Sequence, residues 1–478
     1  MAERVSDTPD DEVTEPMRQV DGDASVPLDG PLVPTVDPSG PKLLGSSSFF
    51  RLWLAQVVSS MGDWIGLFAI LTLTARVGKG SPEAAIALVM SARMIPGFFL
   101  ASVGGVLVDR WDRRKVMVTC DIGRGLVLAT LPLVRSVWGL FLASLVLEVL
   151  TLLWSPAKEA SVPNLVSADR LASANSFSLA AAYGTFPIAS ALFASLTKVA
   201  EVLGRNAGPL DFLSLNQESL AIYFDVMTFF LSGALIWSLT LPRNRPAERA
   251  PIDLTRTFTE IKEGWKFIGT QPTVRSVMVG LGTGLIGGGM IAPLGPIYAN
   301  QVLDAGAAGF GLLLTALGMG LAVGVVGLST FQSRISHSRT FPWAVVGAGA
   351  SMLVAVTMSS LGLTMTFIGI MGICAGAVYV LGFTILQESV EDELRGRTFA
   401  TLYTLSRLCM LISLSLAPLL SRLLDDVSDA LVDGEVDVAG ATLSVPGVRL
   451  TLWLGAAVIL AAGGLALRAS RATPRART

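Results

Sequence analysis

The residues of this chain best suited to carry protons are charged side chains within long apolar stretches. A charged side chain near the centre of a lipid bilayer costs about 2.5–3.5 kcal/mol or more, so it needs a partner, water or a function. Seven such residues occur: Asp63, Arg93, Asp121, Arg124, Glu148, Asp225 and Arg407. Since the single histidine, His337, lies in a predicted loop, carboxyl groups would have to carry any proton relay.

Glu148 is the strongest candidate for a proton carrier. It lies in the stretch SLVLEVLTLLW, where its immediate neighbours are apolar. An isolated carboxylate in a medium of low dielectric constant is costly to keep ionised, so such a group is suited to take up and release a proton. Asp63, near the middle of the first apolar stretch, is the second candidate.

The other charged residues have a simpler explanation as mutually neutralising partners between packed helices. Asp121 and Arg124 are one helical turn apart and are expected to pair with each other. Asp63 could likewise pair with Arg93 on the next span, and Asp225 could cap its helix at the membrane interface. The predicted buried charge partners are Arg93, Arg407, Asp121, Arg124 and Asp225.

The composition indicates that membrane-spanning helices position these residues. Hydrophobic residues make up 52% of the chain and charged residues 15%, with a mean hydropathy of +0.62, whereas soluble domains carry about 25% charged residues. A helix crosses a bilayer with roughly 20 apolar residues, and the apolar runs do not alternate in polarity as barrel strands do. Twelve spans are predicted, at about 50–77, 84–108, 115–135, 138–157, 174–203, 220–241, 273–301, 308–331, 341–360, 362–386, 398–422 and 448–468.

The predicted spans form two related halves. A long polar segment separates the first six spans from the last six, and a Ser-Val pair opens a similar link in each half, at 161–162 and 389–390. We therefore predict an all-α polytopic membrane protein with two pseudo-symmetric six-helix bundles. Its parts are an acidic disordered tail at 1–46, bundles at 47–242 and 273–470, a linker with an amphipathic helix at 243–272, and a basic tail at 471–478.

Lysine and arginine are unevenly distributed between the two sides of the predicted spans. If both termini are cytoplasmic, 25 of the 35 basic residues lie on the inner side, 7 on the outer side and three within helices. Basic residues favour the cytoplasmic side, so we expect both termini there. Abundant arginine, alanine and glycine are typical of a GC-rich bacterial genome, which favours a bacterial plasma membrane.

One charged link carries a family resemblance. GGVLVDRWDRRK, at 104–115, joins the second and third spans and resembles the 2–3 loop signature of the major facilitator superfamily. Residues 155–176 resemble the 4–5 link of its twelve-helix drug:proton antiporter branch, which includes macrolide and siderophore exporters. LRGR at 394–397 and SMGDW at 60–64 also resemble that branch. The resemblance implies the major facilitator fold and transport by alternating access.

The resemblance also implies a cytoplasmic gate in the 2–3 link. The family places Asp109 near the start of the eleventh span, just after Arg397, where a helix N-terminus stabilises a carboxylate. Arg113 could pair with the same carboxylate. The simpler alternative is that the bases of this link only fix the topology. The implied gate residues are Gly105, Asp109, Arg110, Arg113, Arg114 and Arg397.

A substrate path would lie between the halves near the membrane midplane. Aromatic and methionine side chains recur at positions expected there, and such an adaptable lining suits varied amphipathic substrates. Their simpler role is packing or lipid contact. The candidates are Trp64, Phe68, Met94, Phe98, Met290, Tyr298, Tyr379, Phe383 and Met410.

The sequence favours a secondary exporter over other classes of membrane protein. It has no phosphate-binding loop for ATP, no cluster of catalytic residues, and three separated cysteines that favour neither disulfides nor a metal site. We expect proton-coupled efflux of amphipathic, drug-like molecules, and so a role in multidrug resistance. The alternatives are a dedicated exporter of a siderophore, a lysolipid or a self-made antibiotic, and a non-transporting membrane sensor. Expected partners are the lipid bilayer, the substrate and protons, with no cofactor, no nucleic acid and a monomeric state.

Overall fold

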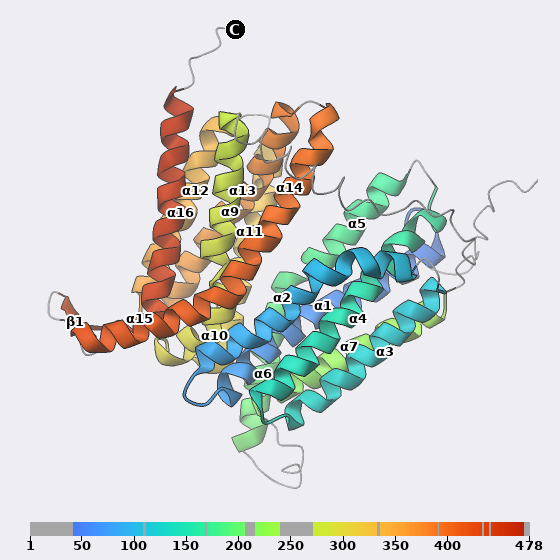
Figure 1. Ribbon diagram of the computed structural model, residues 1–478, viewed down its shortest axis with the longest axis horizontal. Helices are drawn as coiled ribbons and strands as arrows, with labels where there is room; N and C mark the ends of the chain where they lie inside the picture. The colour runs from blue at the N-terminus through green and yellow to red at the C-terminus, as the bar shows by residue number, and fades with distance from the viewer. Residues whose placement is uncertain are drawn as a thin grey trace, which may run out of the picture. The chain divides into compact units, whose positions relative to one another are not determined.

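The described part of the chain folds almost entirely into helices (Figure 1). The structure, a computed structural model, describes residues 42–108, 111–167, 170–205, 216–239, 271–331, 335–390, 392–432, 435–438 and 441–472. All of these residues belong to one structural unit, Val36–Thr478. Nearly all of the predicted acidic tail at 1–46, of the linker at 243–272 and of the basic tail at 471–478 lies outside the described residues.

The first half of the chain forms the helices up to α7. They are α1 (Ser47–Val77), α2 (Pro82–Val108), α3 (Arg113–Thr130), α4 (Val137–Ser161), α5 (Leu171–Tyr183), α6 (Phe186–Arg205) and α7 (Ser219–Trp237). Helix α1 packs on α6 and α7, α2 packs on α4, and α3 packs on α4 and α7. Ser46, Asp112 and Ser136 each accept a hydrogen bond from the backbone N–H three residues on, so these polar caps begin α1, α3 and α4.

The second half contains the remaining helices and one short hairpin. The helices are α9 (Pro272–Gly289), α10 (Ile291–Gln301), α11 (Gly306–Phe331), α12 (His337–Thr357), α13 (Leu361–Ser389), α14 (Asp392–Leu411), η6 (Ile412–Leu416), α15 (Ala417–Val432) and α16 (Gly447–Ala472). Helix α13 packs on α11 and α12, and α16 packs on α9, α12 and α15. Strands β1 (Glu435–Val438) and β2 (Ala441–Ser444) pair antiparallel, with Glu435 opposite Ser444.

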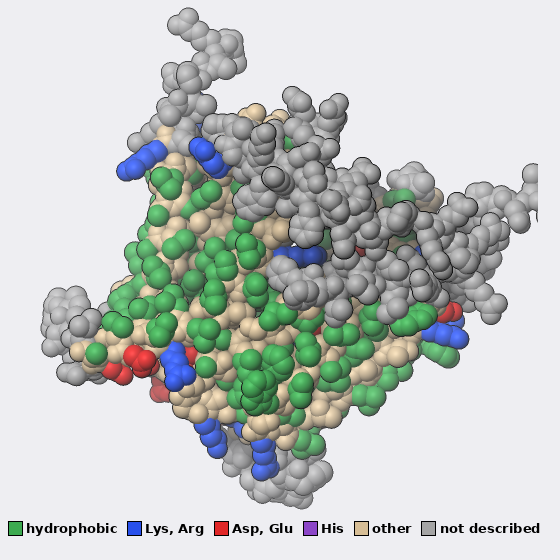
Figure 2. Space-filling view, in the orientation of Figure 1, with side chains coloured by type: hydrophobic (Ala, Val, Ile, Leu, Met, Phe, Trp, Pro, Cys, Tyr) green, Lys and Arg blue, Asp and Glu red, His purple; other side chains and the backbone are tan. Residues whose placement is uncertain are grey.

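The helices agree with the predicted membrane spans. Among the described residues, eleven helical segments are long and apolar enough to cross a bilayer. The 27 residues of α2 give it a length of about 40 Å, which is also sufficient to span a membrane. Helix α2 corresponds to the one predicted span outside these eleven, at 84–108. In Figure 2, apolar side chains cover much of the visible face, and most charged side chains lie near its margins. On α4, exposed Trp138, Leu142 and Val146 follow one another at four-residue spacing, as on a lipid-facing helix.

Three of the predicted spans are interrupted. The fifth breaks at Gly184 and Thr185, between α5 and α6 and two residues before Pro187, and the seventh breaks at Met290 between α9 and α10. In the eleventh span, the π-helical turn η6 separates α14 from α15. All three interrupted spans touch the opposite half: α6 contacts α11, α10 contacts α1 and α2, and η6 contacts α2.

Glycines bring α11 and α13 into close contact. Gly320 and Gly324 on α11, and Gly372 and Gly376 on α13, are each spaced by four residues and face the backbone of the opposite helix. A Cβ atom at Gly376 would lie 2.5 Å from the carbonyl oxygen of Leu321. Small residues at this spacing let membrane helices approach until their backbones touch.

We expect Gly376→Val to destabilise the second half. The added side chain must push α13 away from α11, and overpacking of this kind costs about 1–3 kcal/mol. Thermal unfolding of the purified full-length protein in detergent measures the loss as a lower Tm. Gly362→Val is the matched control on the same helix, because no other heavy atom lies within 4 Å of its added Cβ. Equal Tm values for the two variants would contradict the expectation.

Candidate functional site

The first half buries a cluster of charged side chains. Arg124 of α3 is 2% exposed and forms an ion pair with Asp121, one turn before it on the same helix. The Nη1 atom of Arg124 also lies 3.6 Å from Oδ1 of Asp63 on α1. The structure therefore joins Asp121 to Arg124, as expected from their spacing, but Asp63 contacts Arg124 rather than Arg93.

Aromatic rings and a hydroxyl group complete the surroundings of this pair. The guanidinium carbon of Arg124 lies 4.2 Å from the ring centroid of Phe229 and 5.3 Å from that of Trp154. Ser232 Oγ donates a hydrogen bond to Oδ2 of Asp121 at 2.8 Å. A buried ion pair is tolerated only where further contacts offset the lost hydration, and these contacts supply that offset.

Asp225 is buried within α7, so it does not cap the helix at the membrane interface. Its side chain is 1% exposed, and Thr228 Oγ1 lies 3.1 Å from its Oδ1 atom. Gly62 and Gly66 of α1 lie against its carboxyl group, and a Cβ at either position would overlap a carboxyl oxygen. None of the ion pairs between described residues includes Asp225. The carboxyl group is thus enclosed between two helix backbones without a basic partner.

Glu148 and Arg93 complete the charged cluster from α4 and α2. Glu148 is half-buried and has no hydrogen bond or ion pair with any residue that the structure describes. The charges that act on it belong to Arg93, Asp63 and Arg124. A small cavity of ≈ 10 Å³ is lined by Asp63, Arg93, Arg124 and Asp225. This volume is close to the minimum that one water molecule requires.

The cluster contains more acids than bases. Its four carboxyl groups belong to Asp63, Asp121, Glu148 and Asp225, and its two guanidinium groups to Arg93 and Arg124. Two bases can neutralise two of the four acids. Because an unpaired carboxylate is costly in a membrane interior, the arrangement is suited to binding protons.

Arg407 does not belong to this cluster. Its side chain is exposed, and it has no ion pair or hydrogen bond within the described part of the chain. Leu405 and Cys409, which lie on the other side of α14, face Gly282 of α9. Arg407 is therefore not a buried charge partner, because the packed face of α14 is the one that carries Leu405 and Cys409.

The predicted gate is described only in part. Asp109 and Arg110 lie outside the described residues. Gly105 lies in α2, and Arg397 lies in α14 with a side chain outside the described part. The predicted latch between Asp109 and the eleventh span therefore stays a prediction.

Arg113 and Arg114, at the start of α3, bind the ends of two neighbouring helices. Nη1 of Arg113 donates to the carbonyl oxygen of Ala160 at 2.6 Å, and Nη1 of Arg114 donates to that of Leu239 at 2.9 Å. The Arg114 guanidinium also lies over the ring of Trp237, 4.7 Å from its centroid. A helix C-terminus favours a nearby cation, so both side chains stabilise the packing of α3 against α4 and α7.

An aromatic cluster closes part of the contact between the halves. Phe68 of α1 is 1% exposed, and its ring centroid lies 5.7 Å from those of Phe186 and Phe193 on α6. The ring of Phe310, on α11 in the other half, lies 6.0 Å from Phe68. Trp64 lies edge-on to Phe186 at 4.9 Å. Phe68 is therefore packed against aromatic rings of both halves, at the predicted outer end of the interface between them.

The other predicted path residues occupy both packed and exposed positions. Met290 and Tyr298 are buried, and the Tyr298 hydroxyl lies 3.1 Å from the carbonyl oxygen of Met358. Tyr379 is 55% exposed, and its ring lies 4.5 Å from that of Phe383. Met94 is half-buried, Met410 is exposed, and the side chain of Phe98 lies outside the described part. Their role in a substrate path stays a prediction.

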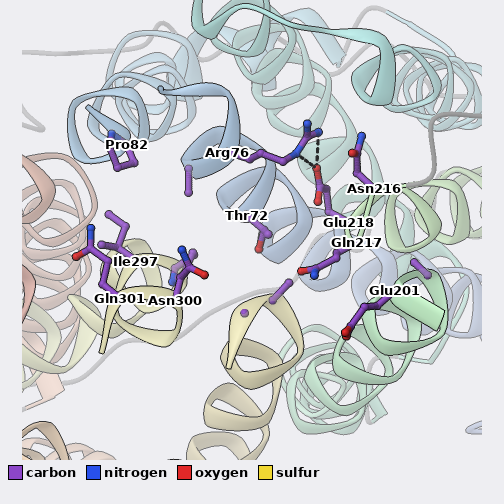
Figure 3. A pocket seen from close by; sticks show the side chains of 15 residues that line it. Thr72, Arg76, Pro82, Glu201, Asn216, Gln217, Glu218, Ile297, Asn300 and Gln301 are labelled. Atoms are coloured by element: carbon purple, nitrogen blue, oxygen red, sulfur yellow. Dashed lines mark hydrogen bonds and ion pairs between the residues drawn. The ribbon is translucent and has the colours of Figure 1, made fainter. Parts of the chain in front are cut away.

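A larger pocket of ≈ 610 Å³ lies between the halves at the predicted outer end (Figure 3). Arg76, Glu201 and Glu218 line it from the first half, and Asn300 and Gln301 of α10 line it from the second. Nε of Arg76 donates to Oε1 of Glu218 at 2.7 Å, and Glu218 is 2% exposed. The pocket therefore offers hydrogen-bonding groups from both halves.

Sequence reasoning missed the small and polar residues that surround the buried acids. Thr228 and Ser232 lie on the same face of α7 as Asp225, at offsets of three and seven residues. Gly62 and Gly66 have the four-residue spacing that permits close helix packing, and they flank Asp63 in the sequence. These two spacings are the signals that could have predicted the contact between α1 and α7.

Comparisons with known proteins identify similar transporters. Residues 43–413 match the family described as Transmembrane secretion effector. The chain is 24% identical over 393 residues to the MFS-type transporter YfiS of Bacillus subtilis, which covers 78% of this chain and 87% of YfiS. It is also 24% identical over 360 residues to the multidrug efflux pump Tap of Mycobacterium bovis, which covers 75% of this chain and 83% of Tap.

A solved structure has the same fold at low sequence identity. It is a bacterial homologue of the human lysosomal transporter Spinster, in an inward-facing and unoccupied conformation. The TM-score is 0.68 at 14% identity, and the match covers 90% of this chain and 98% of that one. The likeness extends over both halves and concerns the fold alone.

Proposed function

The chain belongs to the Transmembrane secretion effector family of the major facilitator superfamily, and from this we propose that it exports amphipathic small molecules in exchange for protons. The similarity to Tap supports outward movement of drug-like compounds. The fold supports secondary transport by alternating access, in which two bundles expose a central path to one side of the membrane at a time.

The charged cluster of the first half is the observation that carries the proposed proton coupling. It combines four carboxyl groups with two guanidinium groups inside a bundle of membrane-spanning helices. Glu148 and Asp63 are its most accessible acids, since Glu148 is half-buried and the Asp63 side chain is 40% exposed. We assign proton uptake and release during transport to these two residues.

The distribution of basic residues supports cytoplasmic termini in a bacterial cell membrane. In that orientation, the contact of Phe68 with Phe310 closes the interface on the outer side. The outer pocket beside Arg76 and Gln301 would offer polar contacts to a molecule that leaves after the aromatic cluster opens.

Ethidium transport in liposomes tests the proposed function. Full-length protein is reconstituted, the lumen is made acidic, and ethidium is added outside together with a control of protein-free liposomes. Transporter molecules inserted with their cytoplasmic face outward should move ethidium into the lumen while protons leave it. We therefore expect ethidium to accumulate in the lumen until nigericin abolishes the pH difference. Ethidium carries a permanent charge, and therefore it is not trapped by acidity alone.

Two outcomes would contradict the proposal. Accumulation that continues after nigericin would exclude coupling to the pH difference. Absence of ethidium transport, with movement of only a siderophore or a lysophospholipid in the same assay, would replace broad export by a dedicated carrier.

A further inference from the structure

The hydroxyl group of Thr228 faces two oxygen atoms of Asp225. Its Oγ1 atom lies 2.8 Å from the backbone carbonyl oxygen of Asp225 and 3.1 Å from the side-chain Oδ1 atom. A threonine hydroxyl has only one hydrogen to donate. The shorter contact is the usual one, because helical threonines donate to a carbonyl three or four residues earlier. The second contact fits a protonated Asp225, whose carboxyl O–H would donate to the oxygen of the Thr228 hydroxyl.

The charges around Asp225 do not supply a base to neutralise it. The groups that act on it are Asp63 from α1, Arg93 from α2 and Arg124 from α3. Arg124 is engaged with Asp121 and lies near Asp63, and no ion pair joins Arg93 to Asp225 in the described part of the chain. With Glu148 the neighbourhood holds four acids and two bases. A proton on Asp225 reduces this excess.

The packing of α1 against α7 depends on the same carboxyl group. One carboxyl oxygen faces Gly62 and the other faces Gly66, and neither glycine leaves space for a side chain. An ionised carboxylate in this position would lie against the backbone of α1 with no donor beyond Thr228. A neutral carboxyl group can donate to Thr228 and pack there at a much smaller electrostatic cost.

We propose that Asp225 holds a proton while α1 is packed on α7, and that transfer of this proton to Asp63 loosens the two helices. The carboxyl O–H bond of Asp225 breaks, an O–H bond forms on the carboxylate of Asp63, and no other bond changes. Both residues line the small cavity that also contacts Arg93 and Arg124. After the transfer, the ionised carboxylate of Asp225 lies against the α1 backbone. The carboxyl group of Asp63, beside Arg124, has become neutral. This inference rests on the proposed proton-coupled transport and adds Asp225 to Glu148 and Asp63 as a third proton-binding residue.

Infrared spectroscopy tests the protonation directly, without a substrate. The full-length protein is labelled with ¹³C in the aspartate carboxyl carbon and reconstituted in vesicles of phosphatidylethanolamine and phosphatidylglycerol. We expect a protonated-carboxyl band at neutral pH that shifts with the label, disappears in Asp225→Asn, and changes frequency in Thr228→Val. Asp429→Asn, at an exposed position on α15, should retain the band unchanged. A wild-type spectrum without a label-sensitive band, or the same band in Asp225→Asn, would overturn the proposal.

Ethidium transport by the same variants tests the coupling step. Asp225→Asn is permanently neutral, so we expect it to bind ethidium but to lose accumulation driven by the pH difference. Accumulation equal to wild type would refute the transfer to Asp63, even if the infrared band is present. If Asp225→Asn does not fold, the change in band frequency in Thr228→Val still tests the protonation of Asp225. If the wild-type protein shows the band but moves no substrate, the proposed function fails while the protonation of Asp225 stands.

Discussion

Glu148→Gln is expected to abolish the accumulation of ethidium in liposomes with an acidic lumen. Glutamine preserves the size of the side chain but cannot release a proton, and no described neighbour of Glu148 forms a hydrogen bond or ion pair with it. Accumulation should fall to the level of protein-free liposomes. Binding of ethidium to the purified variant, measured by fluorescence anisotropy, should persist because the mutation removes a proton site and not an aromatic contact.

The matched control for this prediction is Glu159→Gln. Glu159 lies on the same helix, but its side chain is exposed near the end of α4. This variant should accumulate ethidium like the wild-type protein. Uphill accumulation by Glu148→Gln would exclude Glu148 as a proton carrier. Asp63 and Asp225 would then remain as the acids of the cluster that form no ion pair with a base on their own helix.

Arg124→Met should have the largest effect on stability. Arg124 is 2% exposed and Asp121 is fully buried, so the substitution leaves Asp121 with only the hydroxyl of Ser232 as a described partner. Breaking a buried ion pair in this way costs about 3–5 kcal/mol. We expect a large decrease in the Tm of the detergent-solubilised protein.

A double variant distinguishes the decrease in Tm caused by the broken ion pair from the decrease caused by lost packing. Arg124→Met combined with Asp121→Asn removes both charges of the buried pair and should recover much of the Tm, because residue 121 then carries no uncompensated charge. Arg135→Met, at an exposed position before α4, should have little effect. The interpretation would be contradicted if the double variant were no more stable than Arg124→Met alone.

The number and position of the spanning helices were predictable from apolar length alone. A bilayer imposes a minimum length on each helix, and this constraint is visible in the sequence without knowledge of the fold. The hairpin Glu435–Val438 and Ala441–Ser444 was not predicted, because strands of four residues in an acidic loop leave no periodic signal. The break at Met290 lies just before Pro293 and Pro296, and prolines in a helical segment indicate bending but do not give the residue at which the helix is interrupted.

The buried acids were predictable one by one, but their partners were not. A charged residue in an apolar run is visible in the sequence, whereas its partner depends on how each helix is rotated about its axis. The pairing of Asp121 with Arg124 could be predicted because both lie on α3. The contact of Asp63 with Arg124, and that of Asp225 with Gly62 and Gly66, joins separate helices and required the structure.

The three interrupted spans have a mechanical consequence for the two ends of the interface. A continuous helix transmits a tilt from one membrane surface to the other, whereas a break lets its two segments tilt independently. The breaks before Pro187, at Met290 and at η6 all occur in spans that touch the opposite half. For the proposed transport cycle we therefore expect the outer end of the contact to open by movement of short helical segments, without an equal and opposite rotation of the whole bundle.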